Sequence, residues 1–269
     1  MMMSTRSLMM NVDESRSGPE EQGGGGEIPV SRVLALLDAS RHSLAALAAA
    51  VDLAVMRHAE LVALYVEDQD LLGSAGFPFA REIGATSGRV RRLSRSDLEA
   101  SMARQARRVT EALDAAVAGR ELRHQLRVSR GRVISEALSH AGPGDLLVLG
   151  KAGLSGHWGV RLGSTSRALI LEAPCTVIIW DERLSLARGP LRTLDDPGAG
   201  GEFPPVLEAL TRLFDGREIL PARDARQLEQ QLAHVDSGAL LLHRPQLARL
   251  VDQDADLLAR LLIPVIVVP

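Results

Sequence analysis

The chain has 269 residues, of which 46% are apolar and only 3% aromatic, so the core of one large or two small domains would be built from Leu, Val, Ile and Ala. The formal net charge is −3, and the first 28 residues, with two Arg and five acidic residues, account for all of it. The chain therefore lacks the dominating positive field of a nucleic-acid binder.

The N-terminal segment, residues 1–28, is Met-rich, then polar, and contains four consecutive glycines at 23–26. This composition predicts a disordered tail. No secretory apolar region and no stretch of about 18 apolar residues is present, so we expect no transmembrane helix. The single cysteine, Cys175, cannot form an internal disulfide and lies in an apolar run. We expect a buried, unreactive thiol and a cytosolic protein.

Hydrophobic patterning predicts strands that alternate with helices. Residues 32–37 form a short apolar run, which is typical of a strand buried on both faces, and Ser40 or Ser43 would cap the following helix. Four further strands are expected at 60–66, 120–129, 145–150 and 175–180. Helices are expected at 44–55, 89–118, 133–141 and 164–172, and a loop at 67–85.

This alternation indicates parallel βαβ units with right-handed crossovers. The sequence therefore predicts an α/β fold with an open, doubly wound parallel sheet, and the order that we propose for its five strands is 3-2-1-4-5. Sheets of this kind bind ligands outside the carboxyl ends of their strands, at the switch point. The strands at 32–37 and 145–150 are expected to flank that point.

A shorter α/β pattern, residues 204–269, follows a linker-like stretch at 181–203. In this second half, helices are expected at 205–214, 225–235 and 246–262, and strands at 217–221, 238–243 and 264–269. The order repeats that of the first domain, 29–180, with residues 218–222 equated with 124–128. Asp195 and Asp196 fall roughly where Asp38 stands in the first domain. We expect a degenerate, shortened second copy.

The most informative segment, residues 150–165, joins a predicted strand to a predicted helix. Glycine at 150 and 153 would let the backbone turn sharply and approach a ligand closely. Gly163 and Ser164 open the helix, whose free N–H groups and dipole favour an anion, and the hydroxyls of Ser164 and Thr165 add donors. These features suit a di- or triphosphate, although the segment is neither a Walker A loop nor a Gly-x-Gly-x-x-Gly motif.

The same segment resembles the universal stress protein family, whose nucleotide-binding members carry Gly-x2-Gly-x9-Gly-Ser/Thr. The matching residues are Gly150, Gly153, Gly163 and Ser164. Three other segments resemble family motifs at the ends of the first two strands and in the closing strand: Asp38-Ala39-Ser40, Tyr65-Val66 and residues 172–179. The resemblance covers about residues 31–180 and implies an adenine-nucleotide α-hydrolase-like fold.

The resemblance also implies a ligand, which is ATP, ADP or AMP, with Mg²⁺ as a further candidate. Asp38 would lie by the ribose and phosphates, and the backbone of Val66 would contact adenine. The chain has Ala39 where the family usually has Gly, which would tighten the loop, and Lys151 could pair with a phosphate or point to solvent. The expected binding residues are Asp38, Ala39, Val66, Gly150, Lys151, Gly153, Gly163, Ser164 and Thr165.

Several features also have simpler interpretations. Asp38 could only cap a helix. His157 and Trp158 could cover the ligand or lie at an interface or on the surface. The arginines within residues 89–108 could bind RNA or an acidic partner, or form a solvated helix face. No metal-binding pair and no hydrolase elbow occurs in the sequence, so we expect no catalytic residue, no metal site and at most a weak ATPase or autophosphorylating activity.

The expected function is that of an ATP-binding regulatory or stress-response protein in the cytoplasm with an unidentified protein partner. A nucleotide-free interaction module of the same fold is the alternative. The second half carries His243 and Arg244 where the first carries Gly150 and Lys151, and it has no glycine loop, so we expect no nucleotide there. Family members pair their closing strands across dimers. We therefore expect 175–180 to pair antiparallel with 264–268 in an intrachain pseudo-dimer, and a homodimer is also compatible with the sequence.

Overall fold

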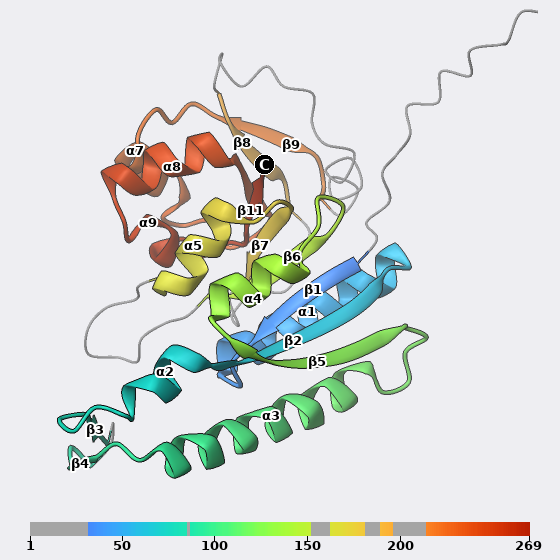
Figure 1. Ribbon diagram of the computed structural model, residues 1–269. Coiled ribbons are helices and arrows are strands. Elements are labelled where there is room, and N and C mark those ends of the chain that lie inside the picture. Colours follow the sequence, from blue (N-terminus) through green and yellow to red (C-terminus); the bar gives the residue numbers. More distant parts are fainter. Residues whose placement is uncertain (1–31, 85–86, 152–161, 181–188, 196–213) are drawn as a thin grey trace, which may run out of the picture.

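A computed structural model describes residues 32–84, 87–151, 162–180, 189–195 and 214–269 (Figure 1). Within them, one nine-stranded sheet runs through the molecule in the order β5-β2-β1-β6-β7-β11-β10-β8-β9. Two clusters of buried side chains cover its faces. One includes helices α1 and α3, and the other includes α4, α5 and the described helices of the second half. None of the described helices has the length and hydrophobicity that crossing a bilayer requires.

The first half has the predicted parallel strand order. Its strands are β1 (Arg32–Leu37), β2 (Glu60–Asp68), β5 (His124–Gly131), β6 (Leu146–Gly150) and β7 (Thr176–Trp180). Its helices are α1 (Arg41–Arg57), α2 (Gln69–Ser74), α3 (Arg95–Val117), α4 (Val133–His140) and α5 (Ser164–Glu172). The order β5-β2-β1-β6-β7 corresponds to 3-2-1-4-5, so the prediction is confirmed and β1 lies beside β6 at the switch point.

The second half is shorter. Its described elements are β8 (Leu191–Leu194), β9 (Arg217–Leu220), α7 (Ala225–Leu232), β10 (Ala239–His243), α8 (Arg244–Gln253), α9 (Leu257–Arg260) and β11 (Val265–Val268). The prediction that residues 218–222 correspond to residues 124–128, which lie in β5, is wrong. β9 pairs with β8 as β2 pairs with β1, so β9 corresponds to β2. The described second half therefore has no counterpart of α3 and β5.

The two halves join through their closing strands, as predicted. β7 pairs antiparallel with β11, and the register places Val267 opposite Val177 and Val265 opposite Ile179. Every residue of both strands is buried. This pairing leaves neither closing strand as an exposed apolar edge.

Two basic side chains, one from each half, form hydrogen bonds across the same junction. The ammonium of Lys151, in the first half, donates to the carbonyl oxygen of Leu261 in the second. Arg244, which occupies the equivalent place after β10, donates from Nε to the carbonyl of Ile170 and from Nη2 to that of Cys175, both at 3.1 Å. Each half therefore donates hydrogen bonds to backbone carbonyls that precede the closing strand of the other half.

The helix predicted at 89–118 begins six residues later, at Arg95, and a hairpin precedes it. Strands β3 (Arg81–Ile83) and β4 (Val90–Arg92) pair antiparallel in a separate two-stranded sheet beside the start of α3 (Figure 1). Gly88 has a φ of +62° and its N–H donates to the carbonyl of Gly84, which fixes the turn. The arginines at 89–92 consequently lie on a hairpin and not on a helix.

Two boundaries in the second half also differ from the sequence predictions. The helix expected at 246–262 is divided into α8 and α9, because Asp254 has an extended backbone and its Oδ1 accepts the N–H of Asp256. Strand β8 lies inside the stretch that was expected to be a linker, 181–203. The helix expected at 205–214 lies almost entirely outside the described residues, as does the tail 1–28.

The only cysteine of the chain is buried, as predicted. Cys175 has no exposed surface and precedes β7. Burial raises the pKa of its thiol to about 11. Since the thiolate is the nucleophilic form, this thiol is a packing group at neutral pH.

Candidate functional site

A cavity of about 430 Å³ lies at the carboxyl ends of β1, β2 and β6, in front of the first turn of α5. Six of the predicted binding residues line it: Asp38, Val66, Gly150, Gly163, Ser164 and Thr165. The other lining residues are Leu36, Leu37, Ser40, Ser43, Tyr65, Asp68, Leu71, Met102, Gln105, Val133, Leu149 and Ser166. The cavity therefore stands at the switch point of the sheet, where the fold predicts a ligand.

The start of α1 forms one wall of the cavity through a chain of hydrogen bonds. Ser40 is the N-cap, and its hydroxyl accepts the N–H of Ser43 at 3.2 Å, so the capping interpretation of Asp38 is wrong. The carboxylate of Asp38 instead accepts the N–H of Ser40 at 2.9 Å. Desolvation acts to raise the pKa of Asp38, but hydrogen bonds from Ser40 and Ser43 outweigh it, and the pKa lies below its usual value. Asp38 is therefore a negative group at neutral pH.

Ala39 shapes this wall without lining the cavity. Its φ is +61°, in the left-handed region that favours glycine. A glycine at this place would have no Cβ, whereas the alanine of this chain stores conformational energy in the turn between β1 and α1.

Replacing Ala39 by glycine is expected to stabilise the protein by about 0.5–1 kcal/mol, because the left-handed turn loses its Cβ strain. Urea unfolding measures the change. Ala48→Gly is the matched control, since Ala48 is exposed in the interior of α1 and the same substitution there should cost about 1 kcal/mol. Equal destabilisation by both substitutions would show that Ala39 carries no strain.

The opposite wall is the N-terminus of α5. Gly163 is its N-cap, and no side chain caps the helix. Among the described residues, nothing accepts the N–H groups of Ser164, Thr165 and Ser166. Three hydroxyls stand on the same turn. Free N–H groups, the positive end of the helix dipole and hydroxyl donors together suit an anionic group.

Gly150 lines the cavity, but the structure shows a reason for glycine at this position that the sequence did not indicate. A Cβ there would lie 2.5 Å from the carbonyl carbon of His42 and 2.7 Å from the backbone nitrogen of Ser43. Both atoms belong to the backbone of α1. Glycine is therefore required for the close packing of β6 against α1, in addition to any approach of a ligand.

Lys151 does not point into the cavity or to solvent, so both sequence interpretations of its side chain are wrong. The side chain is 4% exposed, and its ammonium donates to Leu261 at the junction of the halves. Gly153, His157 and Trp158 lie outside the described residues.

The cavity is also lined by residues that the sequence did not indicate as binding residues. Met102 and Gln105 come from α3, and the hydroxyl of Tyr65 donates to the side chain of Gln105 at 3.0 Å. Asp68 caps α2 by accepting the N–H groups of Asp70 and Leu71. Met102 and Gln105 are three residues apart, and this helical spacing indicates that they share a face of α3. No feature of the sequence indicates that this face lies against the cavity.

No cluster of three or more His, Cys, Asp or Glu side chains in the described part of the chain is arranged to hold a metal ion. Two carboxylates, Asp38 and Asp68, line the cavity, and no Lys or Arg does so among the described residues. A phosphate in this cavity would therefore depend on the helix N-terminus, on hydroxyl donors and on any cation that it brings with it.

Several solved structures of universal stress proteins are similar to this chain. The universal stress protein UspA from Lactobacillus plantarum is 25% identical, with 56% of this chain and 97% of that chain covered and a TM-score of 0.41. A universal stress protein from Archaeoglobus fulgidus is 12% identical, with 88% of this chain and 97% of that chain covered and a TM-score of 0.54. The second match covers 88% of this chain and so includes residues of both halves, which shows a likeness of fold.

A further match is a universal stress protein whose structure was solved in complex with cAMP, with 21% identity, 56% of this chain and 97% of that chain covered and a TM-score of 0.37. No curated protein matches the chain. A sequence model described as the universal stress protein family matches residues 29–180. Because that match comprises more than half of the 269 residues, the chain belongs to the universal stress protein family.

Proposed function

We propose that the first half binds an adenine nucleotide, with ATP as the expected ligand, and that the protein acts as a cytoplasmic regulatory or stress-response protein. The observation that carries the proposal is the uncapped first turn of α5 at the edge of a cavity of about 430 Å³. Gly163, Ser164 and Thr165 would hold the phosphates there. This volume lies within the usual range of small-molecule pockets.

The remaining walls suit the other parts of a nucleotide. Val66, Leu71 and Met102 offer apolar contacts for a base. The backbone of Val66, near the carboxyl end of β2, can form hydrogen bonds with the edge of that base. Asp38 is ionised and can accept hydrogen bonds from ribose hydroxyls. Because Asp38 and Asp68 would repel phosphates, Mg²⁺ is proposed to accompany ATP as a partly hydrated ion.

The nucleotide is proposed as a ligand and not as a substrate. The described lining contains no histidine, lysine or cysteine that could serve as a general base or nucleophile at neutral pH, and its two carboxylates already accept backbone N–H groups. A nucleotide would then stabilise one surface for a protein partner. The alternative, a nucleotide-free interaction module, has the same fold and predicts that no nucleotide is released from the purified protein.

Replacing Gly163 by valine is expected to lower ATP affinity at least about 100-fold, because a branched side chain would occupy the phosphate position and break several charge-assisted hydrogen bonds. Gly163 has a φ of −59° and a ψ of 148°, which valine adopts without strain, so folding should be retained. Isothermal titration calorimetry measures the affinity, and urea unfolding checks the fold.

Gly163→Ala is the graded control and should cause a smaller loss. Mass spectrometry of small molecules released from the wild-type protein separates the proposal from its alternative. Undiminished ATP affinity in a folded Gly163→Val protein would contradict the phosphate position. Failure of ATP, ADP and AMP to bind the wild-type chain would favour the interaction module.

A further inference from the structure

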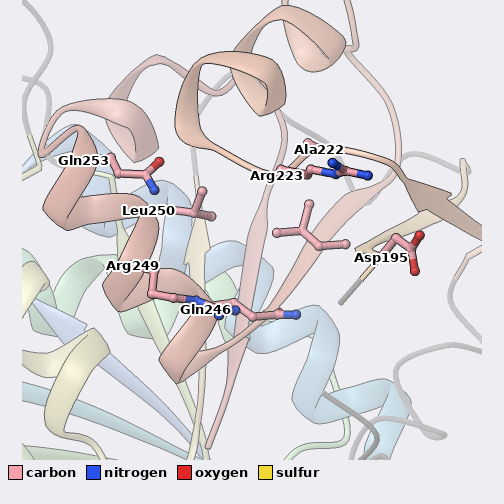
Figure 2. A pocket seen from close by; sticks show the side chains of 8 residues that line it. Asp195, Ala222, Arg223, Gln246, Arg249, Leu250 and Gln253 are labelled. Atoms are coloured by element: carbon pink, nitrogen blue, oxygen red, sulfur yellow. The ribbon is translucent and has the colours of Figure 1, made fainter. Parts of the chain in front are cut away.

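A second cavity, of about 410 Å³, lies in the second half at the place that corresponds to the candidate nucleotide site (Figure 2). It is lined by Leu194, Asp195, Ala222, Arg223, Gln246, Arg249, Leu250 and Gln253. β8 pairs with β10 as β1 pairs with β6, and Asp195 follows β8 as Asp38 follows β1. The carboxyl ends of parallel strands thus converge on this cavity too.

The chemistry of this second cavity differs from that of the first. Helix α8 begins at Arg244, directly after β10, whereas residues 151–163 separate β6 from α5. The second cavity consequently has no phosphate loop, and the first turn of α8 is closed by a capping box between His243 and Gln246. Arginine side chains line it, in contrast to the described lining of the first cavity.

The polar groups come from two sides. Figure 2 shows Gln246, Arg249 and Gln253 along α8, with Arg223 and Asp195 across the cavity from that helix. Two of these groups are held in place. The amide oxygen of Gln246, a residue that is 5% exposed, accepts the N–H of His243 at 2.9 Å, and that of Gln253 accepts the N–H of Ala225 at 2.9 Å.

The two arginines supply the charge. The side chain of Arg223 makes no hydrogen bond or ion pair with any described residue, and it stands next to Ala222 on the loop between β9 and α7. Arg249 lines the same cavity from α8 and, unlike Arg223, already takes part in another polar interaction, so a ligand would share its N–H donors. Guanidinium groups bind carboxylates and phosphates through paired N–H donors, so two of them around one cavity suit a single oxyanion head.

Asp195 restricts the ligand further. A carboxylate in the same cavity as two arginines repels a bare anion but accepts a hydrogen bond from a hydroxyl group. Leu194, Ala222 and Leu250 offer apolar contacts to a short carbon body. We infer that the second half binds a small hydroxylated organic anion, with its oxyanion head between Arg223 and Arg249 and its hydroxyl on Asp195.

The test uses the full chain and two probes that share a hydroxyl but differ in the oxyanion, L-malate and glycerol 3-phosphate. Calorimetry is expected to show one site per chain for at least one probe, and the tighter probe identifies the head group. Arg223→Gln and Arg249→Gln should each weaken that probe about tenfold or more, because each removes charge-assisted hydrogen bonds. ATP affinity at the first site should not change.

Arg226→Gln is the matched control, since Arg226 is exposed on α7 outside the cavity. Succinate, which lacks the hydroxyl of malate, should bind more weakly than malate to the wild type, and Asp195→Asn should reduce that difference. The inference is overturned if neither malate nor glycerol 3-phosphate binds the wild-type chain. It is also overturned if Arg226→Gln weakens binding as much as the two cavity substitutions do.

Discussion

A chain that ends at Trp180 is expected to dimerise or precipitate, whereas the intact chain should not do so through this edge. Removing the second half takes β11 away from β7, whose five residues are all at most 4% exposed in the intact protein. An open, apolar strand edge is a template for pairing with another copy. The ammonium of Lys151 would also lose its acceptor across the junction, the carbonyl of Leu261.

Size-exclusion chromatography with light scattering, over micromolar to millimolar concentrations, measures this outcome. Circular dichroism serves as the control, because the truncated chain must retain its α/β spectrum for association to be attributed to the strand edge. A folded truncated chain that stays monomeric at the highest concentration would count against the role of the β7–β11 pairing in protecting the sheet.

Gly150→Ala is expected to destabilise the protein by about 3 kcal/mol or more, or to prevent folding. The new Cβ would lie 2.5 Å and 2.6 Å from the carbonyl carbon and oxygen of His42. Since both are backbone atoms of α1, no side chain can rotate away, and the whole start of that helix would have to move. The same movement would displace Ser40 and Ser43, and nucleotide affinity should fall with stability.

Gly73→Ala is the matched control for this substitution. Gly73 lies in α2 with no atom within 4 Å of an added Cβ, and alanine there should leave stability unchanged or raise it by about 0.5–1 kcal/mol. Urea unfolding compares the two variants with the wild type. Equal unfolding midpoints for Gly150→Ala and the wild type would show that α1 adjusts freely and that the tight packing is not required.

The sheet could be predicted because its strands are short, continuous apolar runs separated by helical spacing and by glycine or proline. The order of β5, β2, β1, β6 and β7 then followed from the handedness of parallel crossovers and from the resemblance. The antiparallel pairing of β7 with β11 could be predicted for a similar reason, because two apolar closing strands require a cover.

Other parts depend on contacts that local sequence does not encode. β3 and β4 each have three residues, and β8 has four residues inside a stretch rich in glycine and proline, so their signals are weak. The position of Lys151 depends on a carbonyl 110 residues away in the chain. The contribution of Met102 to the cavity depends on how α3 packs against β2, which no motif marks.

Although the chain has two related halves, we expect one nucleotide site, in the first half. Calorimetric titration of the intact, nucleotide-free protein with ATP and Mg²⁺ tests it most directly. One ATP should bind per chain, and Gly163→Val should give no detectable heat of binding. Two ATP per chain, or one ATP that still binds Gly163→Val with unchanged affinity, would contradict it.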